Sequence, residues 1–140
     1  MKKVVCILSC GLLLAGCGSK TAVIKEGKGT YTNDKKEVTT ANVKTKDGKL
    51  SEVEIDETAN GKDQTKKELG NAYNMKQASK IGKEWYEQIA FLENYIVKNG
   101  VDTIKLNSEG KAENNDVKTG CTIRIDGFIQ AVKEAEKNAK

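Results

Sequence analysis

The chain of 140 residues contains no histidine and no proline, and aromatic residues make up only 5% of it. Without histidine, neither a Ser-His-Asp nor a Cys-His catalytic pair can form, and histidine metal sites are excluded. The excess of positive over negative charge is also small, because 24 Lys and Arg residues are balanced by 20 Asp and Glu residues and the net charge is +4. Nucleic-acid binding needs a concentrated basic face, so this balance argues against a nucleic-acid partner.

The first seventeen residues have the composition of a bacterial lipoprotein signal peptide. Lys2 and Lys3 give a positive start, and residues 4–16 form an uncharged, mostly apolar run. A helix of that length reaches only about 20 Å, short of the roughly 30 Å of a hydrocarbon core. The run ends in Leu14-Ala15-Gly16-Cys17, which is similar to a lipobox, so we expect cleavage before Cys17 and a lipid on its sulfur. An ordinary secretory cleavage with an incidental cysteine is the alternative.

The cysteines fit the same organisation. Cys6 and Cys10 would leave with the leader and Cys17 would carry the lipid, so Cys121 is the one remaining thiol of the four. No intramolecular disulfide is then possible, and packing alone must hold the fold. We expect a leader at 1–16, a lipid-anchored tether at 17–28 and one domain at 29–140, held on the extracytoplasmic side of the cell membrane. A third hypothesis is that the cleaved leader acts as a peptide signal through its apolar residues 12–16.

Two kinds of hydrophobic pattern predict an α+β fold. Strands are predicted at 30–32, at 38–46, which is rich in Val and Thr, and at 50–55, where Val53 and Ile55 share one face. Asp47-Gly48 predicts a two-residue hairpin turn. A stripe at helical spacing, followed by the stop signal Asn99-Gly100, predicts a long amphipathic helix. The stripe consists of Ala78, Ile81, Trp85, Ile89, Leu92 and Ile96.

Shorter elements complete the expected domain. Residues 101–106 predict a short strand, and Ser108-Glu109-Gly110 predicts a turn. Asp126 has the chemistry of an N-cap for a last helix that ends near Asn138. The expected architecture is a small antiparallel sheet packed with the long amphipathic helix and the C-terminal helix.

The segment from Asp116 to Thr122 has features of a phosphate site. Thr122 offers a hydroxyl, Gly120 admits close approach, and the start of the next helix favours an anion. Lys118 and Arg124 add positive charge on either side. A plain loop leading into a helix is the alternative that the residues alone leave open.

The same segment resembles the motif of the FMN-binding domain family, Asp-x-x-(Ser/Thr)-Gly-Ala-Thr followed by a helix of the form Phe-x-x-Ala-Val-x-x-Ala. Here the motif and helix positions are Asp116, Thr119, Gly120, Cys121 and Thr122, then Phe128, Ala131, Val132 and Ala135. Gly29-Thr30-Tyr31, the hairpin at 43–50 and the stretch at 67–76 are also similar to this family, so the resemblance spans about residues 27–139. The family includes covalently flavinylated subunits of sodium-pumping NADH:quinone reductases and lipid-anchored flavoproteins.

The resemblance implies that a separate flavin transferase esterifies Thr122 with the FMN phosphate and recognises Asp116, Thr119 and Gly120. A chain without histidine has no obvious base to activate a threonine hydroxyl, which agrees with an outside enzyme. The implied role is electron transfer outside the membrane, with a membrane complex as electron donor, by a carrier rather than an enzyme in its own right. Candidate neighbours of the flavin ring are Tyr73, Met75, Trp85 and Tyr86.

The sequence departs from the family pattern at two positions. Cys121 stands where alanine is usual, and Arg124 stands where small hydroxyl residues are common. Cys121 is interpreted as a buried structural residue, with a redox thiol as the competing hypothesis. The alternative function is a flavin-free surface lipoprotein that acts as a binding or immunogenic module.

Overall fold

The computed structural model describes residues 21–140, and the predicted leader and Cys17 lie outside the described residues. Three strands form an antiparallel sheet in chain order. They are β1 (Ile24–Thr32), β2 (Val38–Lys46) and β3 (Lys49–Glu57). The helices that follow are α1 (Lys66–Leu69), η1 (Gly70–Tyr73), α2 (Trp85–Asn99), η2 (Val101–Thr103), α3 (Asn115–Lys118) and α4 (Asp126–Asn138). The predicted α+β fold with a long helix and a C-terminal helix is confirmed.

The Asp47-Gly48 turn joins β2 and β3 as the sequence predicts. Asp47 and Gly48 have φ angles of 52° and 77°, and positive φ at both central residues is typical of the type I′ turn that suits a twisted hairpin. The ladder then pairs Val43 with Val53 and Ala41 with Ile55. These four side chains are buried, so one face of the hairpin supplies the sheet side of the core.

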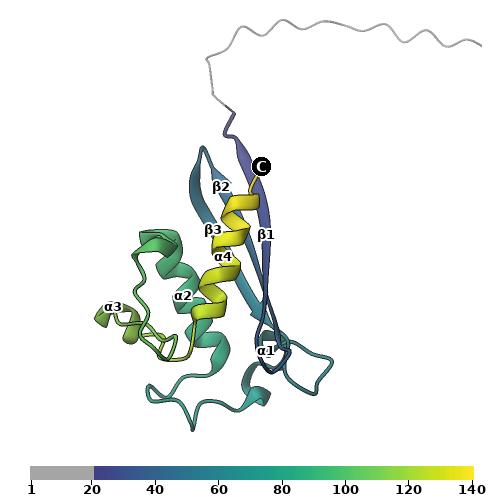
Figure 1. The fold of residues 1–140 in the computed structure, drawn as a ribbon, viewed down its shortest axis with the longest axis vertical. Coiled ribbons are helices and arrows are strands. Elements are labelled where there is room, and N and C mark those ends of the chain that lie inside the picture. The colour runs from purple at the N-terminus through teal and green to yellow at the C-terminus, as the bar shows by residue number, and fades with distance from the viewer. Residues whose placement is uncertain (1–20) are drawn as a thin grey trace, which may run out of the picture.

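Helix α4 lies along β1, where glycines remove the side chains that would hold the two apart (Figure 1). A Cβ on Gly27 would lie 2.0 Å from the Ala135 carbonyl oxygen, and a Cβ on Gly29 would lie 2.1 Å from that of Ala131. Close packing of this strand against the helix therefore needs glycine on β1. The tether predicted at 17–28 is wrong from Ile24 onward, because these residues belong to the sheet.

Side chains of α4 also cover the open edge of β1. The Thr30 backbone N–H donates to Glu134 Oε2 at 2.7 Å, and Asn138 Nδ2 donates to the Lys28 carbonyl at 3.0 Å. These bonds use edge groups that a further strand could otherwise pair with.

Helix α2 begins later than the apolar stripe predicts. Ala78 and Ile81 precede it in turns, and the first helical residue is Trp85. Just before it, the Glu84 backbone N–H donates to the Glu87 carboxylate at 2.8 Å, which satisfies an otherwise unpaired group of the first turn. The predicted end is confirmed, since Gly100 follows Asn99 with φ 86° and its N–H donates to the Ile96 carbonyl.

Two further predictions are wrong in detail. Residues 101–103 form the 3-10 helix η2, and Leu106 makes a single bridge to Ala112 rather than a strand. Asp126 is the first residue of α4 and Ile125 is the N-cap, and the Asp126 carboxylate pairs with Arg124. The turn at 108–110 and the end of α4 at Asn138 are as predicted. Within residues 21–140, no helix combines the length and apolar character that crossing a bilayer requires.

Candidate functional site

Asp116 and Thr119, the first two motif residues, are exposed and lie at α3. The Thr119 hydroxyl donates to the Asp116 carbonyl at 2.6 Å, and the Tyr95 hydroxyl donates to Asp116 Oδ2 at 3.0 Å. Burial and the bond to Asp116 raise the pKa of Tyr95, so this phenol stays protonated at neutral pH. The two residues therefore form an ordered outer surface that another protein can reach.

Gly120 and Cys121 turn inward. A Cβ on Gly120 would lie 2.2 Å from the Phe91 ring, so the close approach that this glycine admits is made by an aromatic ring of α2. The Cys121 side chain is 1% exposed, and burial raises the pKa of its thiol to about 11. A thiol that is protonated and out of contact with water is a poor nucleophile, which favours the structural interpretation of Cys121.

Thr122 is half-buried and is held by one residue of α2. Its backbone N–H donates to Gln88 Oε1 at 3.0 Å, and its hydroxyl lies 3.5 Å from the same oxygen. Gln88 is fully buried, and its Nε2 donates to Ser79 Oγ at 3.1 Å and to the Lys83 carbonyl at 3.2 Å. The amide is therefore fixed on both sides, and the stronger contact to Thr122 uses the backbone and leaves the hydroxyl weakly held.

Arg124, two residues on, forms a bidentate ion pair with Asp126. Arg124 Nε lies 2.8 Å from Oδ1 and Nη2 lies 2.7 Å from Oδ2. The hydrogen bonds from Arg124 lower the pKa of the Asp126 carboxyl. A guanidinium carries five N–H donors, so this pair orients Arg124 without using all of them.

A cleft of about 300 Å³ is lined by Ile123 and Arg124, the two residues that follow Thr122, but not by Thr122 itself. Ile123, Arg124 and the first residues of α4 form one wall, and the β1–β2 turn and the α1–η1 segment form others. Its aromatic and sulfur-containing side chains are Tyr31, Tyr73, Met75, Trp85 and Phe128. The volume is at the lower end of the range for small-molecule sites, which suits one planar ring system better than a whole nucleotide.

The floor of the cleft carries a buried ion cluster, defined here as Lys66, Glu37 and Glu57. Lys66 Nζ lies 3.1 Å from Glu37 Oε1 and is bonded to Glu57 Oε2. The Thr39 hydroxyl donates to Glu57 Oε1 at 2.9 Å, and Asn33 Nδ2 donates to Glu37 Oε2 at 2.8 Å. The three charged side chains are at most 10% exposed, so they are a fixed part of the interior rather than a solvated surface.

Two aromatic rings and the Glu57 carboxylate keep the buried Lys66 in its charged form. Lys66 Nζ lies 5.4 Å from the Tyr73 ring centroid and 5.8 Å from that of Trp85, within the range of a cation–π contact. Burial acts to lower the pKa of Lys66, but the bond to Glu57 and its charge outweigh it and raise that pKa. Lys66 is therefore charged at neutral pH.

Three of the four predicted ring neighbours line this cleft, and one does not. Tyr73, Met75 and Trp85 are in its wall, whereas the Tyr86 hydroxyl donates to Asn71 Oδ1 at 3.2 Å outside it. The sequence reasoning missed the ion cluster, although alternation along β3 places Glu57 on the same face as Val53 and Ile55. A carboxylate on a buried face is the signal that could have revealed it.

Comparisons with known proteins support the fold and no more. No family model matches the chain, and no curated protein matches it. A Clostridium thermocellum protein solved by solution NMR as a structural-genomics target is similar in fold, with a TM-score of 0.52 and 19% sequence identity over 83% of this chain and 89% of that one. At this identity the similarity concerns the arrangement of the elements alone.

Proposed function

We propose that the chain is a lipid-anchored extracytoplasmic flavoprotein that carries FMN as a phosphoester on Thr122 and transfers electrons at the outer face of the cytoplasmic membrane. The observation that carries the proposal is the cleft walled by aromatic side chains, which opens beside Ile123 and Arg124, next to Thr122 in the chain. It supports the proposal because Ile123 and Arg124, which directly follow the motif in the chain, line a space whose volume suits a planar ring.

The residues that line the cleft fit the two parts of FMN, although Thr122 itself is not one of them. Tyr73 and Trp85 offer flat apolar surfaces inside the cleft, and Arg124 lies in the wall with N–H donors beyond those that Asp126 accepts. The ester would join the threonine hydroxyl and the FMN phosphate with net loss of water and leave one negative charge on the phosphodiester, which Arg124, two residues further along the chain, could offset. When bound, the flavin supplies the redox chemistry, while the protein holds and shields it.

Gln88 positions the residue that is modified. Because its carbonyl oxygen accepts the Thr122 backbone N–H at 3.0 Å, that bond remains when the hydroxyl is esterified. The exposed Asp116 and Thr119 on the outer surface are the part of the motif that a flavin transferase could contact. The partners we propose are this transferase, a membrane electron-donor complex and, through Cys17, the membrane lipid.

The test is co-expression of residues 18–140 with a flavin transferase of verified activity, because residues 21–140 contain the complete sheet and core. A denaturing gel under ultraviolet light should show a fluorescent band, and the intact mass should rise by FMN less one water. Thr122→Ala should abolish both signals. Thr30→Ala, an exposed threonine on β1, should keep both.

A dark wild-type band beside an active transferase would overturn the proposal and favour a flavin-free surface lipoprotein. A Thr122→Ala band that stays fluorescent would place the flavin elsewhere and overturn the assignment of Thr122.

A further inference from the structure

The end of the molecule where β1 begins carries a small surface that is both apolar and basic. We call it the strand-start patch, and it consists of Val23, Ile24, Lys25, Lys46 and Lys49. Val23 is 57% exposed and Ile24 is 63% exposed, and these are the exposed large hydrophobic residues of the part of the chain that the structure describes. The three lysines are exposed as well.

Strand pairing places the apolar and basic residues side by side. Ile24 pairs with Lys46 on β2, and Lys46 pairs with Lys49 on β3. Directly opposite residues of antiparallel strands point to the same face of the sheet, so these three side chains form one row. Lys25, the next residue of β1, points to the other face at the same end of the sheet. Apolar side chains flanked by lysines are the composition of surfaces that bind at a lipid–water interface.

Hydrogen bonds fix the start of the sheet to the hairpin turn. The Val23 N–H donates to Asp47 Oδ1 at 3.0 Å, and the Asp47 N–H donates to the Val23 carbonyl at 2.9 Å. The Asp47 carboxylate keeps its negative charge in this bond, and one such charge offsets only one of the three lysines. Val23 and Ile24 are therefore held in their exposed positions.

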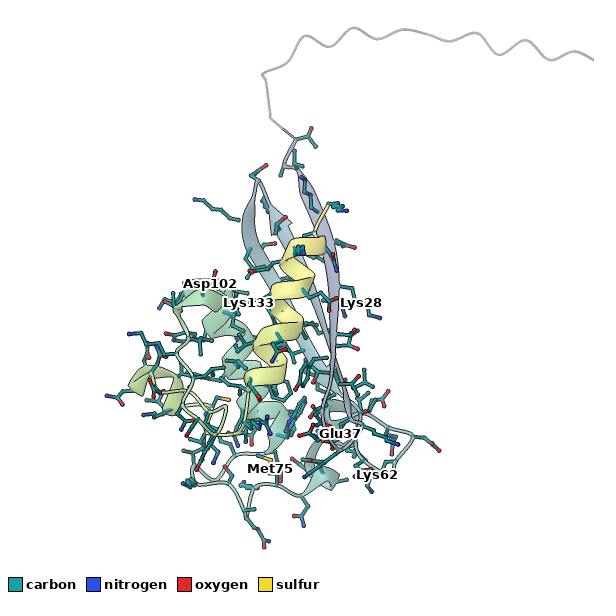
Figure 2. The ribbon with its side chains drawn as sticks, in the orientation of Figure 1. Lys28, Glu37, Lys62, Met75, Asp102 and Lys133 are labelled. Carbon is teal, nitrogen blue, oxygen red and sulfur yellow. The ribbon has the colours of Figure 1, made fainter. Side chains whose placement is uncertain are left out.

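The patch lies near the predicted anchor and far from the cleft. Cys17 is six residues before Val23, and six extended residues span at most about 22 Å. The start of β1 and the β2–β3 turn lie at one end of the molecule, whereas Glu37 and Met75 of the cleft are labelled at the other (Figure 2). Strands of nine residues separate the two ends by about 30 Å.

We propose that the strand-start patch docks on an anionic membrane surface beside the lipid anchor and directs the cleft away from the membrane. Val23 and Ile24 enter the interface, and the lysine ammonium groups contact anionic headgroups. The proposal rests on the proposed extracytoplasmic lipid anchor for its biological setting. The binding itself needs neither the flavin nor the acyl chains, so it can be tested separately.

The experiment is co-sedimentation of unlipidated residues 18–140 with vesicles of phosphatidylcholine, with and without phosphatidylglycerol. Binding should require phosphatidylglycerol and weaken at about 0.5 M salt, where charges are screened within a few Å. Lys46→Gln with Lys49→Gln should lower the partition coefficient by about tenfold or more. Val23→Thr with Ile24→Thr should also lower it while keeping the β-branched side chains that suit a strand.

Matched variants decide the interpretation. Lys62→Gln with Lys76→Gln removes the same charge from exposed positions outside the patch and should leave binding unchanged. Thr122→Ala should also bind as the wild type does, which separates this proposal from the flavin proposal. Absence of binding, equal loss with both lysine pairs, or a dimer that disappears in the Val23→Thr, Ile24→Thr variant would each overturn membrane docking.

Discussion

Replacing Lys66 by methionine removes the only cation of the buried ion cluster and leaves Glu37 and Glu57 without it. Methionine keeps most of the length of the lysine stem, so the change is mainly one of charge. The Lys66 and Glu57 side chains are each 6% exposed and that of Glu37 is 10% exposed, so water does not replace the lost partner. Breaking a buried ion pair from one side costs about 3–5 kcal/mol. Against a typical unfolding free energy of about 5–15 kcal/mol, this is a large loss.

The pH dependence follows from the direction of two pKa shifts. Burial acts to raise the pKa of Glu37, but hydrogen bonds from Asn33 and Lys66 outweigh it and lower that pKa below its usual 4.5. The stability from Glu37 is therefore fully present above about pH 4.5 and is lost as the pH falls through the lowered folded-state pKa. The pKa of Lys66 is raised above 10.5, so its contribution is complete below pH 10.5 and is lost as the pH rises through the raised value.

Lys66→Met changes this profile at the acid side. Without the cation, burial of the Glu37 carboxylate disfavours its charge, and protonation of Glu37 relieves part of the penalty. The deficit of the variant relative to the wild type should therefore be largest at neutral pH and narrower near pH 4.5.

The assay is urea unfolding followed by the fluorescence of Trp85, at pH 7 and at pH 4.5. The matched control is Lys67→Met, because Lys67 is the next residue and pairs with Glu93 at 2.6 Å, but its side chain is 26% exposed. Its loss should cost about 1 kcal/mol. Lys66→Met combined with Glu57→Gln should recover part of the stability. The reasoning is refuted if Lys66→Met costs no more than Lys67→Met, or if its deficit is the same at both pH values.

Two further predictions concern the motif segment. Gly120→Ala should cost about 1–3 kcal/mol in urea unfolding, because the new methyl group overlaps the Phe91 ring, and combination with Phe91→Ala should cost less than the sum of the two changes. Cys121 should resist iodoacetamide at pH 8 in the folded protein and react once urea unfolds it, because its thiol is 1% exposed with a pKa of about 11. Rapid labelling of the folded protein would instead favour the redox-thiol hypothesis.

Local signals predicted the parts of the fold that depend on local chemistry. Asp47-Gly48 specifies its turn through backbone conformation, and Gly100 ends α2, so both were readable from neighbouring residues. The start of α2 could not be predicted in this way, because Ala78 and Ile81 continue the helical spacing although the chain there forms turns. These turns bring Ser79 to Gln88 of α2, so that the Ser79 hydroxyl accepts a hydrogen bond from the Gln88 amide.

Long-range contacts explain what the sequence pattern could not predict. Gly27 looks like part of a flexible tether when it is considered alone, and only the backbone of α4 lying over it gives it a structural role. The ion cluster likewise joins the β1–β2 turn, the end of β3 and the start of α1, so its members are scattered along the sequence. For the candidate site, the sequence pointed to Tyr73, Met75 and Trp85, which line the cleft, but it did not reveal the buried ion cluster.

The charged side chains of the cleft differ between its buried part and its exposed side at Arg124. Its basic side chains are Lys35, Lys66 and Arg124, and its acidic ones are Asp34, Glu37, Glu57 and Asp126. The lining therefore has a formal net charge of −1 although the whole chain has +4, so the cleft as a whole does not attract anions. The buried part favours a neutral flat ring against Tyr73 and Trp85, and a phosphate would be held at Arg124, which is exposed. In our proposal the ring therefore enters the cleft, while the phosphoester stays outside it on Thr122, which is not among the residues that line the cleft.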